Sequence, residues 1–156
     1  YVFILNSDDW YFDNTIEVVS SFFTSNTEVD ILCGSTYNYN ERGKVTHSKN
    51  KSLKLFPLLM PVNHPACFIR KRVYDKVGSF NDTYKVSGDY DFLFRCWKSE
   101  VIFGFTDNVL VNRLMGGFAD LNTNLARIET FKIGYENAKT KFLPQVGYLF
   151  RKLMKR

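Results

Sequence analysis

The chain lacks several features that identify common classes of protein. No hydrophobic run approaches the roughly 20 residues of a membrane-spanning helix, and the N-terminus does not resemble a signal peptide. Its three cysteines, Cys33, Cys67 and Cys96, are scattered without zinc-type spacing and favour buried thiols in a reducing compartment. A glycine-rich phosphate loop, a nucleophile elbow and an interpretable Ser/His/Asp arrangement are also missing. These absences argue against zinc proteins, P-loop nucleotide hydrolases and serine hydrolases.

Basic residues are in excess only near the C-terminal end of the chain. The 156 residues carry a formal net charge of +5. From Arg127 onward, eight Lys and Arg accompany only Glu129 and Glu136, whereas the preceding residues hold thirteen basic and fourteen acidic side chains. With 45% hydrophobic and 17% aromatic residues, the composition is typical of one globular domain. The basic tail fits a membrane surface or another polyanion better than a nucleic-acid-binding fold.

Two adjacent carboxylates follow the first apolar run. Residues 1–5 predict a buried strand, and Asp8 and Asp9 come where that strand should end. Ligands of open α/β sheets bind beyond the carboxyl ends of the strands, and adjacent ionised carboxylates repel unless a cation lies beside them. The pair therefore indicates a site for Mg²⁺ or Mn²⁺. The alternative is a structural pair that caps the next helix or fills a turn.

The pattern of apolar residues and breakers predicts a mixed α/β fold. Helix positions follow steps of three and four, and short apolar runs between turn signals predict strands. The expected elements are a helix over about 14–25 with Asn14 and Glu17 as a capping box, a strand over 29–35, a hairpin or mobile loop over 36–56, a strand over 62–69 broken by its proline, a helix over 70–77 ended by Gly78, a turn over 80–84, a helix from Ser87 onward, and strands over 101–106 and 109–113.

The C-terminal part shows the most regular pattern. Apolar residues from Leu121 to Phe142 predict an amphipathic helix of about five to six turns, which Pro144 ends. A second, shorter apolar face follows, with Arg151, Lys152, Lys155 and Arg156 beside it. The open alternatives are a helix that docks on an anionic membrane and one that packs on the rest of the fold with a solvated basic face.

Further polar residues have both a chemical and a structural interpretation. Asp89 lies at the start of a predicted helix, where the helix dipole stabilises an anion, and it is either a reactive carboxylate or a structural one. Asp91 is expected on the surface or as the partner of Arg95. His64, in an apolar segment, is most simply a core or wall histidine. Arg113, before a Gly-Gly pair that forms a flexible joint, is a candidate phosphate contact on a mobile loop.

Four stretches, in order and spacing, resemble the family 2 glycosyltransferases of the GT-A fold. Together they span roughly residues 1 to 120, and four such stretches in sequence are fairly specific where any one would be weak. The stretches are Phe3-Ile4-Leu5-Asn6-Ser7-Asp8-Asp9-Trp10, His64-Pro65-Ala66-Cys67-Phe68-Ile69-Arg70, Gly78-Ser79-Phe80-Asn81-Asp82-Thr83-Tyr84 and Ser87-Gly88-Asp89-Tyr90-Asp91-Phe92-Leu93-Phe94-Arg95.

The resemblance implies a donor site at the first stretch. Asn6-Ser7-Asp8 stands at the family's Asp-x-Asp position, which binds a divalent cation (Mg²⁺ or Mn²⁺) on the diphosphate of a nucleotide sugar, here a UDP-sugar. Asn6 departs from the first Asp of the motif, so Asp8 becomes the best metal ligand and Asp9 the second. Asn6, Asp8, Asp9 and Arg113 are then the donor-binding residues.

The resemblance also implies a role for Asp89. It matches the catalytic carboxylate, usually written Glu-Asp, with Gly88 in place of the Glu. As general base, Asp89 would take the proton of an acceptor hydroxyl, and a single displacement would invert the anomeric centre. A cation would neutralise the charge that grows on the leaving nucleoside diphosphate.

These inferences give one expectation for the whole chain. Residues 1–120 are the C-terminal portion of a GT-A domain, a partial Rossmann-like mixed sheet flanked by helices, and residues 121–156 are a basic amphipathic helical tail. The N-terminal nucleotide-binding half of the family has no counterpart here, so the chain alone should have little or no transferase activity. The enzyme would be of the hexosyltransferase type and would glycosylate a glycan or lipid-linked acceptor in surface polysaccharide or glycolipid synthesis. Its expected location is the cytoplasm, at the inner face of the plasma membrane.

Two other functions stay open. A non-catalytic carbohydrate- or nucleotide-binding module of the same fold is favoured by Asn6 and Gly88, which both replace carboxylates. A Mg²⁺-dependent phosphohydrolase with Asp8 as nucleophile fits less well, because the further Asp or Lys groups that such chemistry uses are not evident after the strand.

Overall fold

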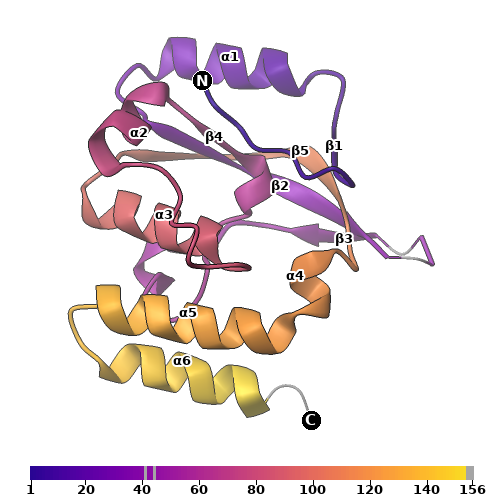
Figure 1. The fold of residues 1–156 in the computed structure, drawn as a ribbon. Helices are drawn as coiled ribbons and strands as arrows, with labels where there is room; N and C mark the ends of the chain where they lie inside the picture. Colours follow the sequence, from indigo (N-terminus) through magenta and orange to yellow (C-terminus); the bar gives the residue numbers. More distant parts are fainter. Residues whose placement is uncertain (41, 44, 154–156) are drawn as a thin grey trace.

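The fold is a mixed α/β sheet flanked by helices, as the sequence predicts (Figure 1). A computed structural model describes residues 1–40, 42–43 and 45–153. The strands are β1 (Trp10–Tyr11), β2 (Ile31–Tyr39), β3 (Val45–Ser48), β4 (Cys67–Ile69) and β5 (Phe103–Leu114). The helices are α1 (Thr15–Ser25), α2 (Lys71–Val77), α3 (Gly88–Lys98), α4 (Phe118–Leu121), α5 (Thr123–Asn137) and α6 (Phe142–Leu153), with short 3₁₀ turns η1 (Leu53–Leu55) and η2 (His64–Ala66).

Strand β2 lies at the centre of the sheet. It runs parallel to β5 on one side and antiparallel to β3 and β4 on the other, and β1 pairs with the far edge of β5. Ile31, Leu32 and Cys33 are completely buried, because both faces of this strand are covered. Ile31 and Cys33 pack with α2, α3 and α5, whereas Leu32 packs with α1. The strand predicted over 29–35 is confirmed, and it continues into a hairpin with β3.

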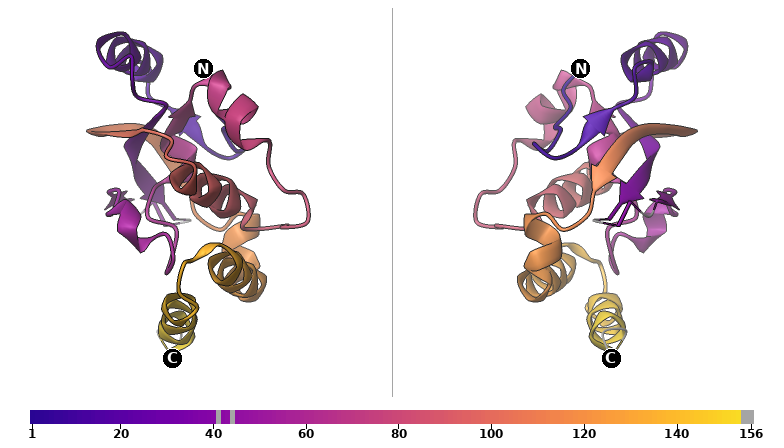
Figure 2. Two further views of the ribbon diagram at one scale, coloured as in Figure 1. Left: turned by 90° about the vertical axis from the view of Figure 1, so that its left-hand side faces the viewer. Right: turned by 90° about the vertical axis from the view of Figure 1, so that its right-hand side faces the viewer.

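The helices lie in successive layers. Figures 1 and 2 show α1 on one side of the sheet, with α3, α5 and α6 following one another away from the other side. The three cysteines are buried and free, which confirms that they are core thiols. Among the described residues, no helix has the length and apolar character to cross a bilayer.

Three predicted strands differ from the observed ones because pairing, and not local pattern, sets their limits. The strands expected over 101–106 and 109–113 form one strand, β5, whose pairing with β2 shifts register next to Ser35. The strand expected over 62–69 is regular only over 67–69. Pro65 cannot donate to a sheet, and it lies in the 3₁₀ turn that precedes β4.

Residues 1–5 do not form the predicted buried strand. Val2 makes an isolated antiparallel bridge with Ile69, with N–H to O distances of 2.7 and 2.9 Å. Phe3, Ile4 and Leu5 are each about 40% exposed. The segment lies beside β4, and only its inner face packs on the fold. The apolar run therefore predicted a burial on both faces that the segment does not have.

Helix α1 begins and ends close to the predicted limits, but its caps differ from the prediction. The side chain of Asn14 makes no capping hydrogen bond. Instead the hydroxyl of Thr15 donates to the Leu110 carbonyl at 2.8 Å, tying the helix start to β5. At the other end, the Arg70 guanidinium donates to the carbonyls of Phe23 and Asn26 at 3.0 and 3.3 Å. A cation at a helix C-terminus also complements the helix dipole.

The helix predicted from Leu121 to Phe142 corresponds mainly to α5, with the last residue of α4 and the first residue of α6 at its limits, and its predicted inner face is wrong. Helix α5 ends at Asn137, and Pro144 lies in the first turn of α6, where a missing N–H costs nothing. The buried residues of α5 are Glu129, Ile133 and Gly134, whereas most of the predicted apolar stripe is exposed. The domain boundary expected at residue 120 stays a prediction. Helix α5 packs on both α3 and α6. Lys155 and Arg156 of the basic tail lie outside the described residues.

Candidate functional site

A cleft opens at the carboxyl ends of the parallel strands β2 and β5, where α/β sheets bind ligands. Its larger part is a cavity of about 570 Å³, with Asp89 and His64 on its wall. A smaller cavity of about 370 Å³ is lined by Asp8 and Asp9. The residues that line both cavities are Asn6, Lys85, Val86, Arg113 and Ala119. The fold therefore brings the two predicted carboxylate sites to one continuous depression.

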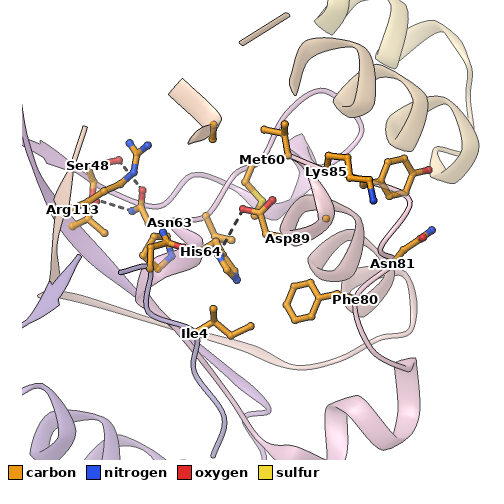
Figure 3. A pocket seen from close by; sticks show the side chains of 18 of the residues that line it. Ile4, Ser48, Met60, Asn63, His64, Phe80, Asn81, Lys85, Asp89 and Arg113 are labelled. Carbon is orange, nitrogen blue, oxygen red and sulfur yellow. Dashed lines mark hydrogen bonds and ion pairs between the residues drawn. The ribbon is translucent and has the colours of Figure 1, made fainter. Parts of the chain in front are cut away.

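Asp89 and His64 lie side by side on the wall of the larger cavity, with their polar atoms turned toward one another (Figure 3). His64 Nδ1 lies 3.7 Å from Asp89 Oδ2, and the other carboxylate oxygen, Oδ1, accepts the backbone N–H of Tyr90 at 2.7 Å. The Asp89 side chain is 35% exposed and that of His64 only 14%. The His64 ring also meets the Phe80 ring edge to face. His64 is thus a wall histidine, as predicted, and its ring nitrogen faces the Asp89 carboxylate.

The start of α3, which carries Asp89, is fixed by a buried carboxylate from α5. Glu129 accepts the backbone N–H groups of Lys85, Val86 and Ser87 at 2.8, 2.9 and 2.8 Å. Burial acts to raise the pKa of Glu129, but the three backbone hydrogen bonds and the nearby Lys85 outweigh it, and the pKa is lowered overall. Glu129 therefore stays ionised and fixes the position of the segment that leads into α3.

Asp9 and Asp8 have different surroundings. Asp9 is buried, and its two oxygens accept the side-chain amide of Asn6 at 2.9 Å and the backbone N–H of Leu114 at 3.1 Å. Burial is the main cause that raises the pKa of Asp9, and the two hydrogen bonds oppose it. Asp8 is half-buried and lines the smaller cavity, with Gly117 so close that a Cβ there would lie 3.1 Å from Asp8 Oδ2. Asp9 organises the loop, and Asp8 faces the cleft.

Two cationic side chains lie between the carboxylate sites. Arg113, predicted on a mobile loop, belongs to β5, and its Nη2 lies 2.9 Å from Asp120 Oδ2. The same Asp120 oxygen accepts the backbone N–H of Gly116 at 2.9 Å. Lys85 Nζ donates to the carbonyl of Asp82 at 2.9 Å. Both cations line both cavities and suit an anionic ligand that bridges them.

Asp91 is a structural residue. It is 4% exposed, and its Oδ2 accepts Arg95 Nε at 2.8 Å. Arg95 also donates to the carbonyls of Val77 and Ser79 at 2.8 Å, so the pair joins α3 to the end of α2. The interpretation of Asp91 as the partner of Arg95 is confirmed, and that of a surface charge is wrong.

Polar residues that the sequence does not mark form one side of the larger cavity. Asn63 Nδ2 donates to the Ser48 carbonyl at 3.0 Å, and Ser48 Oγ donates to Asn63 Oδ1 at 2.8 Å (Figure 3). Asn50, which does not line this cavity, supports Asn63: its Oδ1 accepts the Asn63 backbone N–H at 3.0 Å, and its Nδ2 donates to the carbonyls of Cys33 and Gly34 in β2. Glu129 and Lys85 were missed in the same way. Each lies in a polar or helical stretch where no motif singles it out.

Asp8 lines the cleft, but the described residues do not form a complete set of metal ligands around it. Across residues 1–40, 42–43 and 45–153, no three His, Cys, Asp or Glu side chains gather as metal ligands. A single carboxylate suits Mg²⁺ or Mn²⁺ only where a ligand supplies further oxygens, as phosphates do. Asp8 next to Arg113 fits that requirement.

The chain is similar to two curated proteins, and no protein-family model matches it. They are uncharacterized glycosyltransferases of Rickettsia prowazekii and Rickettsia typhi. Each is 27% identical over 139 aligned residues, which cover 82% of this chain and 43% of the relative. The chain therefore spans less than half the length of these curated relatives, and the similarity supports a general relationship to glycosyltransferases.

Proposed function

We propose that this chain is part of an inverting, metal-dependent glycosyltransferase that uses a nucleotide-sugar donor. The observation that carries the proposal is the shared cleft: Asp8 and Asp89, 81 positions apart in the sequence, line adjoining cavities with Arg113 and Lys85 between them. The names of the two relatives support the same class of enzyme. The resemblance to family 2 of the GT-A fold supports the finer assignment.

On the donor side, Asp8 is the proposed ligand of Mg²⁺ or Mn²⁺. The cation, when bound, would neutralise charge on the diphosphate of the donor, for which we propose a UDP-sugar. Asp9 stays the second candidate ligand, because each of its oxygens keeps a lone pair beyond the hydrogen bond that it accepts. Arg113 is positioned to contact a phosphate, and Asn6 lies where the two cavities join.

On the acceptor side, Asp89 is the proposed general base. It takes the proton of the acceptor hydroxyl while that oxygen bonds to the anomeric carbon, and the bond from this carbon to the diphosphate oxygen breaks with its electron pair. The Tyr90 N–H holds one carboxylate oxygen through a hydrogen bond, and His64 faces the other. One displacement from the face opposite the leaving group inverts the anomeric centre. We propose a hexosyl group as cargo and a glycan or lipid-linked acceptor of cell-surface synthesis.

An Asp89→Asn variant of the complete protein that contains this chain tests the proposal. Turnover of UDP-sugars with Mn²⁺ should fall by about a hundred- to ten-thousand-fold, because the amide cannot accept the proton. Binding of UDP, measured by calorimetry, should be retained. Asp75→Asn, an exposed carboxylate of α2, is the matched control and should leave both unchanged. Unchanged turnover in Asp89→Asn would contradict the assignment of the base.

The same experiment separates the transferase from a non-catalytic binding module. Such a module keeps sugar or nucleotide binding and shows no turnover in the parent protein with any UDP-sugar tested. Asp8→Asn should weaken UDP binding only when Mn²⁺ is present, because the carboxylate acts through the cation. Equal weakening with and without Mn²⁺ would contradict a metal ligand at Asp8.

A further inference from the structure

Helix α6 turns its apolar side away from the rest of the molecule. Successive residues of a helix differ by about 100°, so Phe142, Leu149 and Leu153 lie on one side, and Pro144 and Gly147 on the opposite side. The first three are 68%, 57% and 68% exposed, whereas Pro144 and Gly147 are buried. Figure 2 shows α6 as the outermost layer, beyond α5. An amphipathic helix with its apolar face outward is the reverse of the usual packing in a globular protein.

The inner side of α6 fits the body of the protein closely. A Cβ on Gly147 would lie 2.6 Å from the Leu58 carbonyl oxygen, so only glycine allows this approach. Gly134 of α5 is similarly close to Pro144, at 3.3 Å from an added Cβ. Arg151 donates to the Leu58 carbonyl from the same side. The small inner residues and this arginine fix the rotation of the helix, and with it the outward apolar face.

The preceding helices also expose apolar side chains. Leu121, at the end of α4, is 78% exposed, and Ile128 of α5 is 56% exposed. They belong to the stripe from which the sequence predicts an inner face. Exposed apolar patches of this kind mark surfaces that meet a protein or a membrane.

Charge distinguishes between these two partners. Residues 137–156 contain six Lys and Arg and no Asp or Glu. Within the described part, Lys139 precedes α6 and Lys152 lies on its flank, and both are exposed. Helix α5 carries two carboxylates, of which Glu129 is buried and paired. Glu136 is exposed and accepts a hydrogen bond from the Tyr84 hydroxyl. Two copies of this chain that met through α6 would bring like charges together, whereas an anionic bilayer offers the opposite charge.

We propose that α6 docks on an anionic lipid surface, with Phe142, Val146, Leu149, Phe150 and Leu153 in the interface and the flanking lysines at the headgroups. This is how a helix with an apolar face and a basic flank binds a membrane without crossing it. The proposal does not depend on the chemistry of the cleft. It extends the membrane-docking alternative that the sequence offers for the basic tail, because the structure shows which side of α6 is free to contact a lipid surface.

Vesicle co-sedimentation of the full chain tests the proposal. The chain should bind vesicles of phosphatidylcholine and phosphatidylglycerol in equal parts, and should bind pure phosphatidylcholine much more weakly. A Leu149→Ser/Phe150→Ser double variant should lose about tenfold or more of the binding. Lys139→Glu/Lys152→Glu should lose at least about fivefold for each lysine, and the loss should disappear at high salt.

Ile16→Ser is the matched control, since Ile16 is 52% exposed on α1, far from α6 in Figure 1. It should leave vesicle binding unchanged. Urea midpoints of the variants, each altered only at exposed sites, report whether the fold is kept, and the charge variant tests the proposal even if the apolar one fails to fold. Absence of binding to anionic vesicles, or equal binding to neutral ones, would overturn the proposal. So would a dimer that Leu149→Ser/Phe150→Ser dissociates, because α6 would then be a contact between copies.

Discussion

Replacing Glu129 with glutamine is expected to loosen the start of α3, and with it Asp89, without altering any residue that lines the cleft. Glu129 Oε1 accepts the Lys85 N–H, and Oε2 accepts those of Val86 and Ser87. Glutamine keeps only one acceptor oxygen. Its NH₂ group would point at a backbone N–H in either orientation, so at least one of the three donors loses its partner inside the protein.

The expected loss of stability follows from these contacts. A hydrogen bond to a charged group contributes about 1.5–3 kcal/mol, and a buried donor left without a partner costs a similar amount. We therefore expect Glu129→Gln to lower the free energy of unfolding by about 2–3 kcal/mol. Glu129→Ala removes all three acceptor contacts and should lower it by about 3–5 kcal/mol.

Urea unfolding followed by circular dichroism measures the effect. With a slope of about 2 kcal/mol per molar urea, the midpoint of Glu129→Gln should fall by about 1–1.5 M at neutral pH. Because the pKa of Glu129 is lowered in the folded state from its ordinary 4.5, the stabilisation is complete above that value and is lost as the pH falls through the folded pKa. The difference between the parent and Glu129→Gln should therefore be constant from neutral pH to about 5 and shrink below 4.5.

Glu136→Gln is the matched control on the same helix. Glu136 is exposed and accepts one hydrogen bond, from the Tyr84 hydroxyl at 2.9 Å. Its loss should change the free energy of unfolding by less than about 0.5 kcal/mol. A Glu129→Gln midpoint within roughly 0.25 M of the parent, or a difference that grows on acidification, would refute the reasoning.

Two further substitutions test how α1 and α6 pack on the rest of the fold, each by urea unfolding. Arg70→Ala should lower the free energy of unfolding by about 2–3 kcal/mol, because the guanidinium donates to the carbonyls of Val29 and Phe23 and lies 4.7 Å from the Phe23 ring centre. Arg70→Lys should restore little of this loss. Full rescue by lysine would show that charge alone matters. Gly147→Ala should lower the free energy of unfolding by about 1–3 kcal/mol and speed amide hydrogen exchange in α6, because its Cβ would collide with the Leu58 carbonyl. Val146→Ala, on the outward side of the helix, should have little effect. Equal effects of the two variants would contradict the observed rotation of α6.

Much of the local structure is predictable from the sequence because its causes are local. The limits of α1 and α2 and the start of α3 follow from helical periodicity and from breakers such as Gly78, whose φ of 84° suits glycine. The centre of β2 is predictable because a run of Ile31, Leu32 and Cys33 is apolar at every position, as a strand covered on both faces requires. The partnership of Asp91 and Arg95 follows from their spacing of four in a helix.

The candidate site is predictable only in part. Asp8, Asp89 and Arg113 were selected one at a time, each beside a structural alternative, and only the pairing of β2 with β5 and the position of α3 bring them to one cleft. The roles of His64 and Glu129 depend on contacts across 25 and more than 40 positions of sequence, which no local pattern encodes.

The amino-acid sequence by itself determined where α1, α2, the start of α3 and the centre of β2 lie, and it indicated two carboxylate sites and a basic amphipathic end. Tertiary structure alone decided which way these features face. Periodicity shows that a helix has an apolar side, but burial of that side depends on what lies beside the helix. In α5 the covered side includes Glu129, because three backbone N–H groups need an acceptor there. In α6 the covered side includes Gly147, because the chain at Leu58 comes too close for a larger residue. The apolar side of α6 is left to face outward for that steric reason.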